Sequence, residues 1–182
     1  MGLLKKSLRL LSLSILITLL HILVVSLLPY PLNHINIAVL LMLLIFIIIT
    51  KESCIWLGVL VGLFLEIFAS VPYGVNLISL VLSLVFTNWL SLNIFTHRSM
   101  YMVFVTGVIG TFIYRLVFSM LIFFISVLNQ TDFYLFKGSM MLDMGVEILI
   151  TGFTLFILYV VLIKILKYLR SDYLSESGSI KL

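Results

Sequence analysis

Charged residues are scarce in this chain: Asp, Glu, Lys and Arg make up 10% of its 182 residues, against about 25% in a soluble domain. The alternation of polar and apolar residues that marks a transmembrane β-barrel is missing as well. Hydrophobic residues make up 63% of the total and are gathered in long blocks. Since about 20 helical residues cross a hydrocarbon core about 30 Å thick, the sequence predicts an all-α membrane protein.

Residues suited to catalysis or metal binding are equally scarce. The single cysteine, Cys54, excludes an internal disulfide and a cysteine-based metal cluster. His34 and His97 are expected in loops on opposite sides of the membrane, and His21 in a helix, so the three do not suit one metal site. H-E-x-x-H, G-x-S-x-G and phosphate-binding glycine-rich motifs do not occur in the sequence. The sequence therefore predicts no enzyme, no catalytic or metal-binding residue and no cofactor.

Six apolar blocks predict six transmembrane helices in a domain of residues 1–170, followed by a short, polar and disordered cytoplasmic tail at 171–182. The first block is longer than the core of about 7–15 residues in a signal peptide, and no A-x-A-like cleavage site follows it, so we expect a retained helix. The blocks cover residues 10–28, 35–50, 54–70, 75–95, 100–128 and 140–163.

The basic residues predict the orientation. With the N-terminus inside, nine Lys and Arg residues lie at the inner side and only Lys137 at the outer side. This positive-inside pattern predicts cytoplasmic N- and C-termini in the cell membrane. It also explains the net charge of +4 better than nucleic-acid binding does. The inner residues are Lys5, Lys6, Arg9, Lys51, Arg98, Lys164, Lys167, Arg170 and Lys181.

Five ionisable residues fall inside the predicted spans: His21, Glu66, Arg115, Asp143 and Glu147. A charge at the bilayer centre costs roughly 2.5–3.5 kcal/mol on insertion scales, so such groups face protein or water. We expect Glu66 to be enclosed by the bundle with Arg115 as its partner, and Asp143 to share a helix face with Glu147. The first interpretation is a structural ion pair. A ligand or proton pathway and a contact with a partner's transmembrane segment are the alternatives.

Small and polar residues predict close helix packing. Gly58 and Gly62 form a G-x-x-x-G motif, and Gly107 and Gly110 are similarly spaced, so another helix of this chain or of a partner can approach closely. For a membrane-protein partner, the sequence offers further polar groups, an outer turn and an outer loop rich in aromatics. An interfacial aromatic belt is the alternative role for the rings of that loop. These are Ser79, Ser83, Asn88, the turn 71–76, and the loop 129–139 with Phe133, Tyr134 and Phe136.

Residues 36–99 resemble MreD, the small membrane subunit of the bacterial rod-shape system. The second apolar block opens with Asn36, and the fourth ends near Arg98, close to the family's basic inner turn. Between them lies a run similar to the family's pattern of glycine, apolar residues, an acid, a small residue and then leucine-glycine. An aspartate is usual where this chain has Glu66, and leucine is common where it has Tyr73. The run is Gly58-Val-Leu-Val-Gly62-Leu-Phe-Leu-Glu66-Ile-Phe-Ala-Ser-Val-Pro72-Tyr-Gly74-Val-Asn76.

The resemblance implies a non-enzymatic scaffold that acts with MreC, a single-span protein, and indirectly with MreB filaments, RodA and a class B penicillin-binding protein. It assigns no role to Arg115, Asp143 or Glu147. The family also resembles the substrate-binding subunits of energy-coupling-factor vitamin transporters, which makes capture of a small solute the alternative function. Those subunits carry an A-x-x-x-A motif on the first helix, whereas the only alanines here are Ala38 and Ala69. A channel or ion carrier is a third interpretation.

Overall fold

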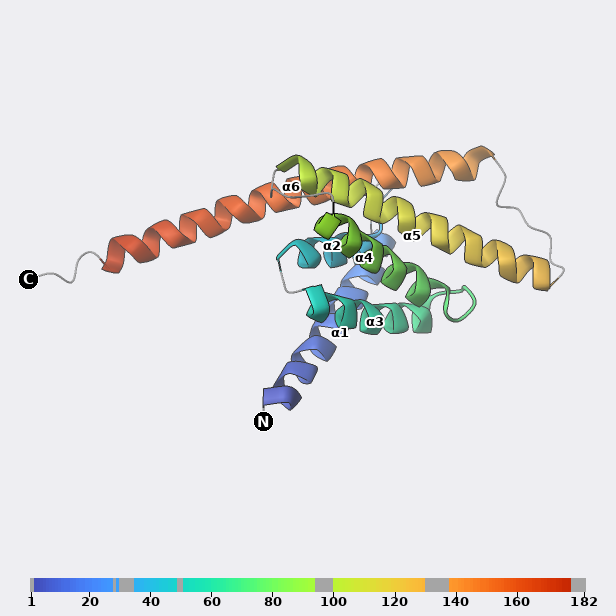
Figure 1. Cartoon of the computed structure of the whole chain (residues 1–182), viewed down its shortest axis with the longest axis horizontal. Helices are drawn as coiled ribbons and strands as arrows, with labels where there is room; N and C mark the ends of the chain where they lie inside the picture. Colours follow the sequence, from blue (N-terminus) through green and yellow to red (C-terminus); the bar gives the residue numbers. More distant parts are fainter. Residues whose placement is uncertain are drawn as a thin grey trace, which may run out of the picture.

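The computed structural model describes residues 2–27, 29, 35–48, 51–93, 100–129 and 138–177. These residues form six α-helices and no strand, so the predicted all-α class is confirmed (Figure 1). Four helices, α1, α4, α5 and α6, are long and apolar enough to cross a membrane. The helices are α1 (Gly2–Leu27), α2 (Ile37–Ile48), α3 (Lys51–Phe68), α4 (Val75–Asn93), α5 (Met100–Leu128) and α6 (Gly138–Ser177).

Helix α2 lies at the centre of the bundle. It has 12 residues, about 18 Å at 1.5 Å per residue, which is less than a hydrocarbon core of about 30 Å. It contacts all five other helices, and Ala38, Met42 and Leu43 are fully buried. A helix that is apolar on every face is expected to be buried on every face. The second apolar block therefore forms an internal helix shorter than the full span predicted for it.

Helix α1 packs against α3 and α2 through one face and exposes the other. Ser14, Ile17 and Thr18 are buried, whereas Leu16 and Leu23 are 59% and 57% exposed. Inside the helix, the Ser14 hydroxyl donates to the Leu11 carbonyl and the Thr18 hydroxyl to the Ser14 carbonyl. The buried hydroxyls are thus satisfied locally, and the exposed leucines suit contact with lipid.

Helices α5 and α6 are long and pack against each other at one face of the bundle, diverging toward the C-terminal end of α5 (Figure 1). Helix α6 has 40 residues, about 60 Å, and its C-terminal half extends beyond the other helices (Figure 1). It continues to Ser177, past residue 171, where the sequence predicts the start of a polar tail.

Several predicted features lie outside the described residues. They are the loop position His34, the connection with His97 and Arg98, and the loop aromatics Phe133, Tyr134 and Phe136.

Candidate functional site

The α3–α4 hairpin is held by a glutamate near the end of α3. Glu66 is 7% exposed, and its Oε1 accepts a hydrogen bond from the Leu77 backbone N–H at 3.1 Å. Leu77 is the third residue of α4, so this N–H has no partner within its own helix. Glu66 therefore acts as a cap for α4, supplied by the preceding helix. Its predicted enclosure is confirmed, and the carboxyl group is engaged with backbone.

Glycines set the close spacing of this hairpin. A Cβ added to Gly62 would lie 2.7 Å from the Leu77 Cα, and one added to Gly58 would clash with a Leu84 methyl carbon. The turn ends at Gly74, whose φ of +95° favours glycine, while Pro72 is exposed in it. The G-x-x-x-G face is thus covered by α4 of the same chain and is not open to a partner.

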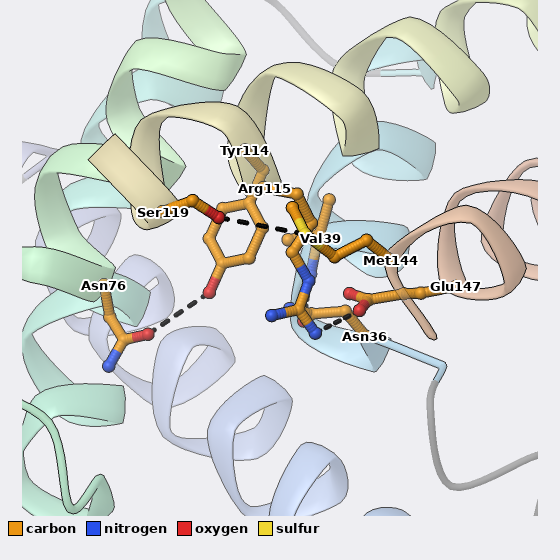
Figure 2. Close-up of polar contacts among 8 residues, drawn as sticks. All are labelled: Asn36, Val39, Asn76, Tyr114, Arg115, Ser119, Met144 and Glu147. Carbon is orange, nitrogen blue, oxygen red and sulfur yellow. Dashed lines mark hydrogen bonds and ion pairs between the residues drawn. The ribbon is translucent and has the colours of Figure 1, made fainter. Parts of the chain in front are cut away.

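The α5–α6 pair is held by an ion pair. Arg115 from α5 bonds the carboxylate of Glu147 on α6, whose side chain is 1% exposed, while that of Arg115 is 28% exposed (Figure 2). The guanidinium carbon lies 5.7 Å from the Phe118 ring centroid, within range of a cation–π contact. Asp143, one turn before Glu147, is half-buried. Of the alternatives for the ionisable residues, the structural ion pair is the one seen here.

The predicted Glu66–Arg115 partnership is therefore wrong. Helix depth placed both residues in the same half of the bundle, but depth alone does not say which helices are neighbours. Arg115 lies on the side of α5 that meets α6, where it pairs with Glu147. Glu66 instead faces the first turn of α4.

Polar contacts also join α4 to α5. The Tyr114 hydroxyl donates to Asn76 Oδ1 at 3.2 Å (Figure 2), and the Ser83 hydroxyl donates to the Gly110 carbonyl at 2.6 Å. Ser79 donates within α4 to Val75. Ser79 and Ser83 are 0% and 1% exposed. Ser83 thus makes an interhelical hydrogen bond of the predicted kind, but within the chain's own bundle, and neither serine is open to a partner protein.

A cavity with a mainly apolar lining and a few polar groups lies where α1 and α3 end and α2 and α4 begin. Its volume is about 340 Å³, and its polar lining includes His21 of α1, Asn36 before α2, Asn76 of α4 and Tyr114 of α5. Of these four, the sequence predicts His21 as an ionisable residue inside a span, and Asn36 and Asn76 belong to the segment that resembles MreD, but the sequence assigns none of the four to a cavity. Asn36 and Asn76 carry a weak signal, since each stands at the start of an apolar block. Nothing in the sequence distinguishes Tyr114 from the other tyrosines.

Within the described part of the chain, no cluster of three or more His, Cys, Asp or Glu side chains is arranged to hold a metal ion. Cys54 is fully buried, with its Sγ 3.6 Å from the Met42 carbonyl oxygen. Comparison of the chain with protein-family models, with curated proteins and with solved structures gives no match.

Proposed function

We propose that this protein is a non-enzymatic scaffold subunit of the bacterial cell-elongation machinery, embedded in the cytoplasmic membrane. It would bind an MreC-like single-span protein and, through it, influence MreB filaments, RodA and a class B penicillin-binding protein. The structure supplies the membrane-type helical bundle that this role requires. The partners come from the resemblance of residues 36–99 to MreD.

The observation that carries the proposal is the structural role of the residues that make the resemblance. Gly62 permits contact with the Leu77 backbone, Glu66 caps α4 and Gly74 supplies the left-handed turn. These residues together determine the shape of one hairpin. Members of one protein family share a fold, so the residues that determine the shape of this hairpin are the ones expected to recur among them.

The hairpin presents an apolar end that suits a partner protein. Ile67, Phe68 and Tyr73 are 63%, 60% and 83% exposed at the turn between α3 and α4. Exposed aromatic side chains carry much of the binding energy in protein interfaces. In the proposed orientation, with both termini inside, this end faces outward, where the external domain of an MreC-like partner would lie.

Cysteine labelling tests the orientation. In a Cys54→Ser background, a cysteine at Asn129, which is exposed at the end of α5, should react with an impermeant thiol reagent added to intact cells. A cysteine at Ser175 should react only after the cells are opened. Labelling of a cysteine at position 175 from outside would show that the orientation is the reverse of the proposed one and that the α3–α4 turn faces inward.

The proposed partner is tested by purification from the native membrane in mild detergent, followed by mass spectrometry. An MreC-like single-span protein should co-purify in near-stoichiometric amount, and Tyr73→Ala should reduce its recovery several-fold. Tyr101→Ala is the matched control, because Tyr101 is also 83% exposed but lies at the start of α5, on the predicted inner side. Recovery of an ATP-driven transporter module instead would replace the scaffold role with the alternative, a substrate-binding transporter subunit.

A further inference from the structure

The cavity between α1 and α5 has the size of a small-molecule site. Its volume is about 340 Å³, within the range of about 300–1,000 Å³ for ligand pockets. Four helices contribute to its wall, and Leu65 and Phe68 of α3, with Ala69 directly after that helix, form part of an apolar wall. One apolar wall with a few convergent polar groups is the usual composition of such sites.

The polar groups point to a ligand that hydrogen-bonds. Within the described residues, Nδ1 of His21 is buried and has no hydrogen-bond partner, although burying a polar atom without a partner is costly. Tyr114 and Asn76 are 4% and 7% exposed. Their mutual bond uses the Tyr114 proton and the Asn76 carbonyl oxygen, and the Tyr114 oxygen also has a hydrogen bond with the Asn36 side chain. The Asn76 amide –NH₂ is therefore the group left for another molecule.

The lining also limits the charge of that molecule. No Asp, Glu, Lys or Arg is among the described residues that line the cavity. Glu66 and Arg115 are sequence neighbours of the lining residues Leu65 and Tyr114. However, Glu66 bonds the Leu77 backbone and Arg115 bonds Glu147. A charged ligand would therefore lose hydration without gaining an opposite charge in the wall, which is unfavourable.

We propose that this cavity binds a small uncharged molecule, such as a nitrogen heterocycle or a primary amide, with an apolar face toward Phe68 and a hydrogen-bonding edge toward His21 and Asn76. A partner's transmembrane helix fits less well, because Asn76 and Tyr114 lie inside the bundle and not on its outer surface. The inference concerns this site alone and does not depend on the proposed scaffold function.

Matched pairs of probes test the proposal on the full-length protein in lipid nanodiscs by calorimetric titration. Nicotinamide and uracil are the uncharged probes, and nicotinate and orotate are the same rings with a carboxylate. At least one uncharged probe should bind saturably, and its carboxylate counterpart should bind at least about tenfold more weakly. Ala69→Leu should abolish binding by filling the cavity. Tyr114→Phe should weaken binding about fivefold, because Asn76 loses the hydroxyl that holds its side chain in place.

Tyr101→Phe is the control for Tyr114→Phe, since Tyr101 is 83% exposed and distant from the cavity lining; it should bind as the unmodified protein does. Each variant is first checked for folding by the thermal exposure of Cys54, so that a loss of binding is assigned only to a folded protein. Failure of both uncharged probes to bind would overturn the proposal. So would equal binding of the carboxylates, or unchanged binding in folded Ala69→Leu and Tyr114→Phe.

Discussion

The α3–α4 hairpin and the α5–α6 pair are held together by different kinds of polar contact. Each joins two apolar helices, and each contains a buried glutamate and a glycine at the closest approach. In the hairpin, Glu66 bonds the Leu77 backbone N–H beside Gly62. In the long pair, Glu147 bonds the Arg115 side chain, and Gly152 of α6 lies against Gly107 of α5.

This difference indicates which kind of substitution should destabilise each helix pair. A carboxyl group that bonds backbone can be replaced by any side chain that supplies an oxygen at the same place. A carboxylate that bonds a guanidinium depends on the charge of one side chain, in a membrane interior where a charge is expensive. The hairpin is therefore expected to be sensitive to shape and the long pair to charge.

The largest effect is expected when the charge of Arg115 is removed. Arg115→Met leaves Glu147, 1% exposed, without its guanidinium, and removal of one partner from a buried pair costs about 3–5 kcal/mol. Thermal unfolding in mild detergent measures the loss. The readout is the reaction of Cys54, 0% exposed in the folded protein, with a thiol-reactive fluorophore.

The matched changes at this pair are Glu147→Gln and the double variant. Glu147→Gln should cost less than Arg115→Met, because the Arg115 side chain is 28% exposed and its long stem lets the charge reach a polar region. The double variant should cost less than the sum of the two single variants. Additive losses would show that the ion pair contributes little coupling.

An intermediate effect is expected from a shape change in the hairpin. Gly62→Ala places a methyl group 2.7 Å from the Leu77 Cα, a backbone atom that does not rotate away, and such overpacking costs about 1–3 kcal/mol. Gly145→Ala on α6 is the control, since nothing lies within 4 Å of its added Cβ. That control should be neutral or slightly stabilising, because alanine favours helix by roughly 1 kcal/mol over glycine. Equal melting temperatures for the two variants would contradict the close contact.

The smallest effect is expected when Glu66 loses its charge but keeps its oxygen. Glu66→Gln should cost less than about 1 kcal/mol, since the amide oxygen still accepts the Leu77 N–H and only the helix-dipole interaction weakens. Glu66→Leu removes the cap and should cost about 1–2 kcal/mol. The same thermal assay ranks the two.

Combination with Arg115→Met then sharpens the comparison. Because Glu66 and Arg115 have separate partners, the losses of Glu66→Gln and Arg115→Met should add. Strongly non-additive losses of stability would instead indicate that Glu66 and Arg115 interact directly.

The helical class, the positions of the six helices and the enclosure of Glu66 follow from the sequence alone. Apolar runs separated by proline, glycine and charged residues leave few options in lipid, where each helix satisfies its own backbone groups. The close approaches at Gly62, Gly107 and Gly110 follow for a similar reason, since a residue without a side chain marks where another helix can approach.

The partners of the buried polar residues were decided only by the tertiary structure. Apolar periodicity states how deep a residue lies along its helix but not which helix it faces. Arg115 was therefore assigned to Glu66 instead of Glu147. The same limit hid the cavity at His21, Asn76 and Tyr114, because those residues come from helices far apart in the chain. The central position of α2 was also decided by the tertiary structure. With 12 residues, α2 is too short to cross the hydrocarbon core and is instead surrounded by the other five helices.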